Sequence, residues 1–189
     1  MSSHHFVKDK QEPALIIESL ATFGMEYLGQ LLEWNPLVIC ASKAYSELEE
    51  RQIKADVLSS DFEKMPIFQN DVKEVDYPHS FIDAALAYLI HEKYDAVNII
   101  TESAFYKQKL LVYAPLLNLI VYCGQRRSFA VRSGFSKWKP AHSVIQMQDL
   151  STLQVEGLEK IGPGQYITEQ DGFYRVEFDQ DYFFITEEI

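Results

Sequence analysis

Residues 38–64, VICASKAYSELEERQIKADVLSSDFEK, decide the fold of this chain. The stretch opens with a short apolar run, residues 38–41, as a strand buried on both faces of a sheet requires. Residues 43–52 are rich in Glu, Leu and Ala and predict a helix. Val57 and Leu58 predict a second strand, which a polar turn follows. This order of strand, helix and strand indicates one unit of a parallel α/β sheet.

The same alternation of strands and helices extends on both sides of this stretch, as far as about residue 124. Apolar residues at helical spacing alternate with short apolar runs, whereas residues 65–78 are charged and turn-rich and predict a loop. The additional predicted strands are residues 14–17, 97–100 and 119–123, and the additional predicted helices are residues 23–34, 81–89 and 110–117.

The pattern changes after Gly124, where hydrophobic and polar residues begin to alternate with a period of two. Residues 127–132, 143–148 and 173–179 show this alternation, and glycines and prolines separate the runs. The predicted fold class is therefore α/β, with an N-terminal parallel-sheet domain of the nucleotide-binding type at residues 1–124. An all-β sandwich is expected to follow at residues 125–189.

Composition excludes several classes of function. The chain has 189 residues and a net charge of −11, which argues against nucleic acid or an anionic membrane surface as a partner. No apolar run approaches the length of about 20 residues that a transmembrane helix needs. Residues 1–13 contain no apolar core of a signal peptide. Cys40 and Cys123 both fall within apolar runs, which predicts buried free thiols and a cytoplasmic protein.

Two carboxylates follow the second strand of the opening stretch. Asp61 and Glu63 come directly after Ser59 and Ser60, at the carboxyl end of that strand. Ligands of open α/β sheets bind beyond the carboxyl ends of the strands, so a metal–phosphate site is one interpretation of this pair. A solvated turn is the other.

The opening stretch also resembles the thiamine pyrophosphokinase family. The family pattern is an A-D-G-G/A-A segment, a helix, and a K-P-D strand that leads into G-D-F/L-D-S. Residues 41–45, ASKAY, stand in the first place and residues 53–64, IKADVLSSDFEK, in the second. The resemblance implies an α/β domain followed by a β-sandwich, and transfer of pyrophosphate from ATP to thiamine with the help of Mg²⁺. It also implies a homodimer with the thiamine pocket between subunits.

The resemblance assigns roles residue by residue, and the matches are partial. Asp61 keeps a family aspartate, Glu63 replaces a second one, and Asp83 keeps a third, so catalytic and metal-binding roles are implied for these three. Ser42 replaces the aspartate of A-D-G-G, and Lys43 replaces its first glycine. Substrate binding is implied for both. A solvated lysine at the start of a helix is the alternative for Lys43, and a favourable charge in a first helical turn is the alternative for Asp83.

A further family segment, G-G-R-x-D-H, aligns with residues 104–109, AFYKQK. Gln108 there replaces an aspartate, whereas Lys107 and Lys109 would offer positive charge to a phosphate. Three hypotheses follow. The protein is a thiamine pyrophosphokinase of weakened activity, a non-catalytic relative that binds a small ligand or a protein, or an unrelated phosphate-binding α/β protein.

Overall fold

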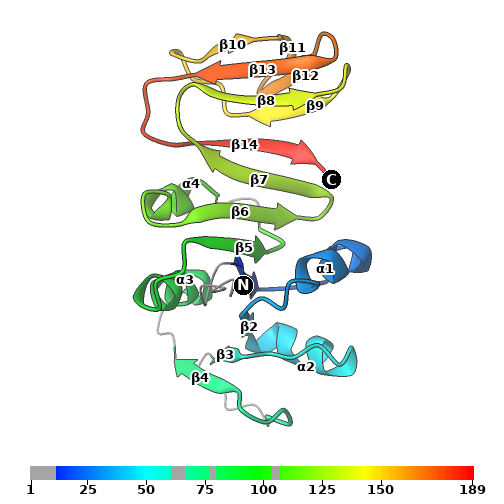
Figure 1. The fold of residues 1–189 in the computed structure, drawn as a ribbon, viewed down its shortest axis with the longest axis vertical. Helices are drawn as coiled ribbons and strands as arrows, with labels where there is room; N and C mark the ends of the chain where they lie inside the picture. The colour runs from blue at the N-terminus through cyan, green and yellow to red at the C-terminus, as the bar shows by residue number, and fades with distance from the viewer. Residues whose placement is uncertain (1–11, 61–66, 77–79, 104–106) are drawn as a thin grey trace, which may run out of the picture.

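The computed structural model describes residues 12–60, 67–76, 80–103 and 107–189 (Figure 1). Asp61 and Glu63 lie outside the described residues, as do the first eleven residues of the chain. Among the residues that are described, no helix is long and apolar enough to cross a bilayer.

Parallel strands form the N-terminal half. Each pairs with its neighbours in parallel register, in the spatial order β4-β3-β2-β1-β5-β6. All four residues of β1 and of β2 are buried, because helices cover both faces of the sheet. The bounds are β1 (Ala14–Ile17), β2 (Val38–Ala41), β3 (Val57–Ser60), β4 (Lys73–Asp76), β5 (Ala96–Ile100) and β6 (Asn118–Cys123).

Strand β4 corrects the loop predicted at residues 65–78. Its sequence, KEVD, carries three charged residues and no apolar alternation, so the pattern gave no strand signal. It pairs in parallel with β3 at the end of the sheet, where a strand has only one neighbour. Charged residues are common on such edge strands, because they oppose pairing with other chains.

The helices divide between the two faces of the parallel strands. Helices α1 and α2 pack with Leu15, Ile17 and Cys40, whereas α3 packs with Ile16 and Ile39 on the opposite face. Burial raises the pKa of the Cys40 thiol to about 12, so this cysteine is a core residue. The bounds are α1 (Met25–Leu32), α2 (Ser42–Glu50), α3 (Phe81–His91), α4 (Lys107–Leu110) and the 3₁₀ turn η2 (Leu111–Tyr113).

The helix predicted at residues 110–117 is wrong in its extent. The chain forms the short α4 and then η2, and the 3₁₀ turn ends at Tyr113. Pro115 has no backbone N–H to donate to an earlier carbonyl, which disfavours a longer helix.

The C-terminal part contains antiparallel strands in two layers. Strands β10, β13 and β8 form a small sheet, and the other strands after residue 124 continue the large one. The layers share a core that includes Ile145, Tyr174, Val176, Phe183 and Ile185. The bounds are β7 (Arg126–Val131), β8 (Phe135–Lys139), β9 (Val144–Met147), β10 (Gln154–Glu156), β11 (Leu158–Gly162), β12 (Gln165–Thr168), β13 (Gly172–Glu177) and β14 (Phe183–Glu188).

One sheet runs through both parts of the chain. Across the described residues it has eleven strands in the order β11-β12-β9-β14-β7-β6-β5-β1-β2-β3-β4, and β6 pairs with β7 in antiparallel register. The predicted α/β class is confirmed in its coarse form, and the strands described after residue 124 are antiparallel. The description of that part as a sandwich stays a prediction. The division into domains at residues 1–124 and 125–189 stays a prediction, because backbone hydrogen bonds cross that point.

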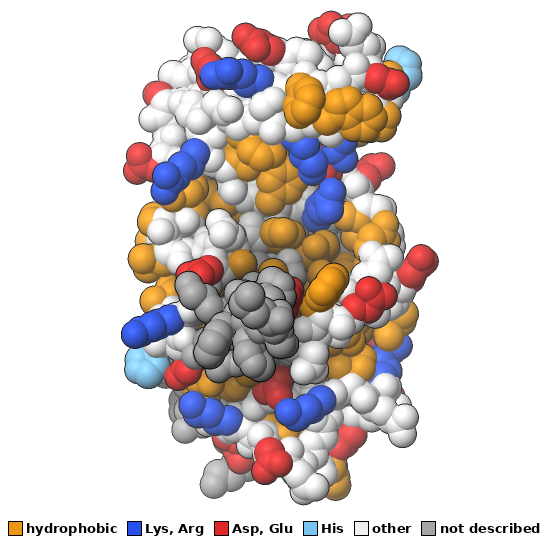
Figure 2. Space-filling view, in the orientation of Figure 1, with side chains coloured by type: hydrophobic (Ala, Val, Ile, Leu, Met, Phe, Trp, Pro, Cys, Tyr) orange, Lys and Arg blue, Asp and Glu red, His pale blue; other side chains and the backbone are white. Residues whose placement is uncertain are grey.

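The surface of the molecule is mixed in character. Figure 2 shows hydrophobic side chains across the middle of one face, with Lys and Arg side chains among them and acidic side chains distributed over the rest. These positive side chains are in the minority, because the chain has a net charge of −11.

Candidate functional site at the carboxyl edge of the parallel strands

The direction of chain progression reverses beside β1. From β1 the chain builds β2, β3 and β4 on one side, and then returns to place β5 on the other side of β1. Loops leave β1 and β5 in opposite directions at such a point, and the crevice between them is where open α/β sheets bind ligands. The residues that follow these two strands are Glu18 and Thr101.

Glu18 is the centre of a polar cluster at this switch point. The hydroxyl of the buried Thr101 donates a hydrogen bond to Glu18 Oε2. The ammonium of Lys43, at the start of α2, lies 3.3 Å from Glu18 Oε1. The Glu18 side chain is only 17% exposed, whereas that of Lys43 is 58% exposed. Lys43 is therefore ion-paired and still accessible to a ligand.

Neighbouring loops add further polar groups. The hydroxyl of Ser19 donates to Glu102 Oε1 at 2.8 Å, and the backbone N–H of Ser103 donates to Thr101 Oγ1 at 3.1 Å. Cys123, which ends β6, contacts the carbonyl oxygen of Glu102 through Sγ at 3.3 Å. The loops after β1 and β5 are thereby fixed to each other and to the end of β6.

Ser42 lies deeper in the same edge. Its side chain is 8% exposed, and its hydroxyl donates a long bond of 3.4 Å to the carbonyl oxygen of Ser59 at the end of β3. The hydroxyl oxygen of Ser59 is buried and has no hydrogen-bond partner among the described residues. A buried polar group without a partner costs free energy, so these two serines mark a place where a ligand donor or acceptor would be favourable.

Asp83 lies in the first turn of α3. Its backbone N–H is capped by the hydroxyl of Ser80 at 3.3 Å, and its Oδ1 accepts a hydrogen bond of 2.9 Å from the hydroxyl of Tyr113. Burial and this bond to Asp83 raise the pKa of Tyr113 to about 12. The tyrosine is therefore a stable proton donor to Asp83.

The structure places the predicted site residues unevenly. Ser42 and Lys43 directly follow β2 at the carboxyl edge, and Asp83 is in the helix that follows β4. Lys109 is exposed on α4, and the side chain of Lys107 lies outside the described part. The roles of these residues, and those of Asp61 and Glu63, stay predictions.

Sequence reasoning missed Glu18 and Thr101. Each directly follows a buried strand, which is the same signal that singled out Asp61. Neither position belongs to a motif within residues 38–64, although the strand end before each one is a signal that the sequence offers.

The described residues alone do not fit Mg²⁺. This ion needs several oxygen ligands, carboxylates foremost. Glu18 is already paired with Lys43, and Asp83 accepts from Tyr113. In the described ranges, no group of three or more His, Cys, Asp and Glu residues is placed to hold a metal ion.

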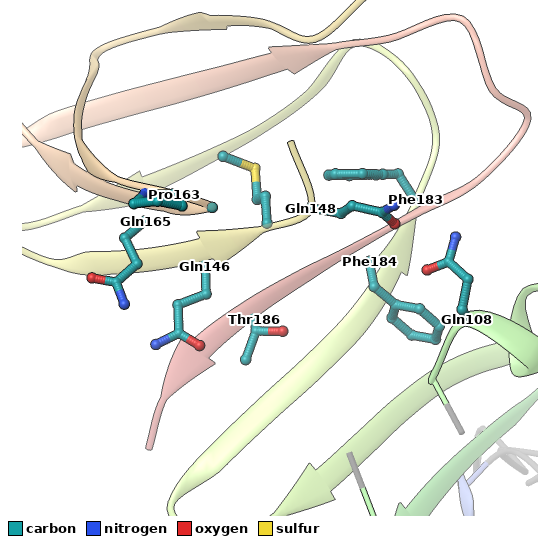
Figure 3. Close-up of a pocket in the computed structure, with 10 residues that line it drawn as sticks. Gln108, Gln146, Gln148, Pro163, Gln165, Phe183, Phe184 and Thr186 are labelled. Carbon is teal, nitrogen blue, oxygen red and sulfur yellow. The ribbon is translucent and has the colours of Figure 1, made fainter. Parts of the chain in front are cut away.

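A cavity of about 490 Å³ lies between α4 and the strands of the C-terminal part (Figure 3). Neutral amide side chains come to it from two sides, because Gln108 is on α4 and Gln146 is on β9. Cross-strand register sets Gln146 beside Thr186 on one side and beside Gln165 on the other. The lining residues are Gln108, Gln146, Met147, Gln148, Pro163, Gly164, Gln165, Phe183, Phe184 and Thr186.

These features define a class of protein, an α/β protein with a polar switch point and a second, antiparallel part. Comparison with solved structures gives the particular fold, which is that of the thiamine pyrophosphokinases. The thiamin pyrophosphokinase of Candida albicans superposes with a TM-score of 0.70 at 13% identity, over 94% of this chain and 90% of that one. The enzyme of Geobacillus thermodenitrificans gives a TM-score of 0.68 at 11% identity, over 93% of this chain and 96% of that one. The yeast enzyme gives a TM-score of 0.67 at 8% identity, over 98% of this chain and 88% of that one.

The likeness is one of fold, at low sequence identity. No family model matches the chain, and no curated protein matches it in sequence. The predicted resemblance to thiamine pyrophosphokinases is confirmed at the level of the fold.

Proposed function

We propose that this protein is a thiamine pyrophosphokinase-like protein that binds ATP and thiamine and transfers pyrophosphate between them with greatly weakened activity. The observation that carries the proposal is the fold likeness over nearly the whole chain, together with a polar cluster at the switch point. ATP would enter at the carboxyl edge, where Lys43 is accessible and Ser42 lies below it.

The charges at this edge support the proposal of weakened activity. Pyrophosphoryl transfer depends on positive charge around the phosphates. Glu18 instead places a negative charge at the switch point and neutralises Lys43. A magnesium site would have to be built on Asp61, Glu63 and Asp83, since Glu18 is committed to its ion pair with Lys43 and Glu102 accepts from Ser19.

A second candidate is a non-catalytic protein that binds a neutral polar molecule. The cavity between α4 and the C-terminal strands favours it, because amide and hydroxyl groups of Gln108, Gln146, Gln165 and Thr186 offer both donors and acceptors. Its walls contain no charged side chain among the residues that line it. A ligand held there would be uncharged and flat enough to contact Phe184.

The two candidates separate in one assay. With saturating ATP, thiamine and Mg²⁺, we expect thiamine-dependent formation of AMP at a rate at least about a hundredfold below that of a thiamine pyrophosphokinase assayed in parallel. Asp83→Ala and Asp61→Ala should abolish the remaining rate, whereas Asp179→Ala, an exposed aspartate in the C-terminal part, serves as the control. Robust wild-type turnover would refute weakened activity, and no AMP at all would leave the binding candidate.

Ligand binding is measured separately by thermal unfolding with ATP, Mg²⁺, thiamine and thiamine diphosphate. A ligand of the cavity should lose its stabilising effect in Gln146→Leu and keep it in Gln170→Leu, which changes an exposed glutamine in a turn. Equal stabilisation of both variants would place the ligand outside the cavity.

A further inference from the structure

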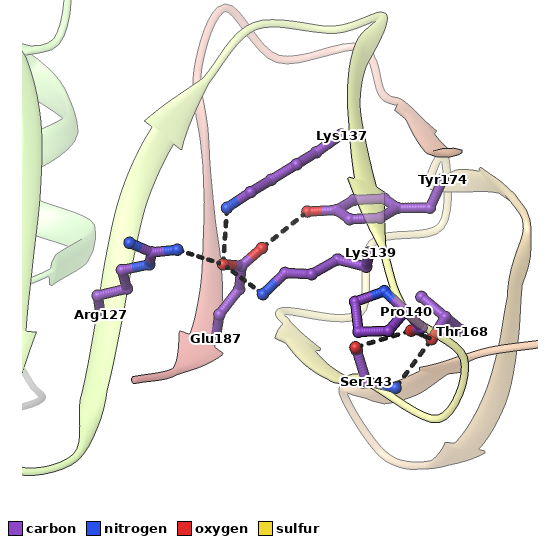
Figure 4. A network of polar contacts seen from close by, with 8 residues as sticks. All are labelled: Arg127, Lys137, Lys139, Pro140, Ser143, Thr168, Tyr174 and Glu187. Carbon is purple, nitrogen blue, oxygen red and sulfur yellow. Dashed lines mark hydrogen bonds and ion pairs between the residues drawn. The ribbon is translucent and has the colours of Figure 1, made fainter. Parts of the chain in front are cut away.

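A buried carboxylate in the C-terminal part is surrounded by three cations (Figure 4). Glu187 on β14 has a fully buried side chain, and its Oε2 lies 2.7 Å from the ammonium of Lys137 and 3.0 Å from that of Lys139. The guanidinium of Arg127 approaches the same oxygen at 3.3 Å. The remaining oxygen, Oε1, accepts a hydrogen bond from Tyr174 at 3.3 Å.

The strands hold these groups in fixed positions. Arg127 and Glu187 are cross-strand partners on β7 and β14, and Lys137 and Lys139 share one face of β8. The turn after Lys139 is held firmly, because the carbonyl oxygen of Pro140 accepts hydrogen bonds from Ser143 at 2.8 Å and from Thr168 at 2.6 Å. The cation cluster is therefore preorganised.

Charge in this cluster is not balanced. Three positive groups around one carboxylate leave an excess of two positive charges, in a chain whose net charge is −11. Burial lowers the pKa of Lys137, and the charges of Arg127 and Lys139 lower it further, whereas the hydrogen bond that Lys137 donates to Glu187 acts to raise it. A second anion beside the cluster would relieve this repulsion.

The three cations remain partly accessible to solvent, and one donor among them has no partner. The buried Nε of Arg127 has no hydrogen-bond partner among the described residues. The side chains of Arg127, Lys137 and Lys139 are 38%, 30% and 18% exposed, although Glu187 is not exposed at all. An anion can therefore approach from the solvent side while Glu187 holds the cations from within.

We propose that Arg127, Lys137 and Lys139 form a binding site for a small oxyanion with two negative charges, which is the chemistry of a phosphate group. Two charges would balance the excess, and a tetrahedral oxyanion accepts several charge-assisted hydrogen bonds at once. The proposal is independent of the proposed function, since none of these residues belongs to the switch-point cluster of Glu18, Thr101 and Lys43.

The experiment is a calorimetric titration of the full chain with inorganic phosphate and, separately, with glycerol phosphate, at constant ionic strength in chloride. We expect phosphate to bind the wild type, and Lys137→Met/Lys139→Met to weaken binding about tenfold or more. Lys160→Met is the matched control, because Lys160 pairs with Asp149 on an exposed strand of the same part. It should bind phosphate as the wild type does.

Two further variants keep the test informative if the double variant does not fold. Arg127→Met removes one partly exposed cation and should also weaken phosphate binding. Glu187→Gln leaves three cations without their carboxylate, so phosphate should raise its unfolding temperature more than that of the wild type. Tighter binding of the ester than of the free ion would assign the site to a phosphorylated small molecule. Absence of phosphate binding to the wild type, or equal affinity in all variants, would overturn the proposal.

Discussion

Glu187 shows how a single buried charge is retained in this fold. Burial acts to raise its pKa, but the hydrogen bonds from Lys137 and Lys139 outweigh burial and lower the pKa below the ordinary value of 4.5. Glu18 is the corresponding residue in the parallel part, where Thr101 and Lys43 hold it. In both places the surrounding cations and hydroxyls are what allow a carboxylate inside the protein.

Replacement of Glu187 by Gln should destabilise the protein by about 3 kcal/mol, because it leaves three partly buried cations without their partner. Urea unfolding at pH 7 measures this change in the free energy of unfolding. Glu188→Gln, which alters the exposed neighbour on the same strand, should change it by less than about 0.5 kcal/mol. Equal effects of the two substitutions would contradict the role given to the cluster.

Glu187 also makes a specific contribution to acid stability. Since its pKa is lower in the folded protein than in the unfolded chain, its contribution is fully present above pH 4.5, the ordinary value, and is lost as the pH falls through the folded value. Unfolding measured from pH 7 down to pH 3 should therefore show a shallower loss of stability in Glu187→Gln than in the wild type. Parallel curves would show that Glu187 has an ordinary pKa.

Removal of the Glu18 charge should strengthen nucleotide binding. Glu18→Gln frees Lys43 and removes a negative charge from the switch point, so we expect ATP to bind about tenfold more tightly. Isothermal titration measures the affinity. Glu47→Gln is the control, because Glu47 is also paired with a cation, Arg51, but on the exposed part of α2. Unchanged ATP affinity in Glu18→Gln would place the nucleotide elsewhere.

At the scale of elements, tight turns decide how the antiparallel strands pair. Gly164 lies in the turn between β11 and β12 with a φ of +63°, and a Cβ there would come within 2.6 Å of the carbonyl oxygen of Met147. The backbone N–H of Met147 in turn donates to the carbonyl oxygen of Gly164 at 2.9 Å. The close approach of this turn to β9 helps to form one wall of the amide-lined cavity.

Gly164→Ala should destabilise the protein by about 3 kcal/mol, from the left-handed backbone and the steric overlap together. Gly124→Ala is the matched control, since Gly124 has a φ of +57° but a Cβ would meet nothing within 4 Å. It should cost about 1 kcal/mol, the backbone contribution alone. Urea unfolding measures the loss of unfolding free energy in each variant. Equal losses would show that the structure relaxes to remove the steric overlap with Met147.

The whole molecule is acidic, and two features of its described surface differ from that character. One is the cation cluster around Glu187, and the other is an exposed pair of aromatic side chains on the small sheet. Trp138 and Phe173 are cross-strand partners on β8 and β13, and they are 51% and 72% exposed. Exposed aromatic pairs of this kind favour contact with another protein surface.

We expect the protein to be a homodimer, as the resemblance to thiamine pyrophosphokinases implies, with this aromatic pair at or near the contact. Sedimentation should give a mass of twice the 21.9 kDa of the chain. Phe173→Glu should shift the equilibrium toward the monomer, whereas Val112→Glu, at a position 70% exposed on η2, should not. A monomeric wild type at high concentration would contradict the dimer.

The sequence by itself determined the class of fold and the nature of its parts. Short apolar runs such as residues 38–41 predict strands buried on both faces, because a strand covered on both sides has few positions for a polar residue. The change to alternating residues after Gly124 predicts an all-β part, because side chains of a strand point to opposite faces in turn. Ser42 and Lys43 were singled out by the resemblance to the thiamine pyrophosphokinase motif, and they directly follow β2.

Only the tertiary structure decided which distant residues meet. Glu18 and Thr101 lie 83 positions apart, and Arg127 and Glu187 lie 60 apart. Their contacts depend on strand order and register, which no local pattern encodes. The same holds for the continuous sheet and for the charged edge strand β4, because strand pairing comes from backbone hydrogen bonds that every residue type except proline can make. A local sequence pattern indicates which side chains of one segment are buried, whereas a site is formed by side chains that the tertiary structure brings together from distant segments.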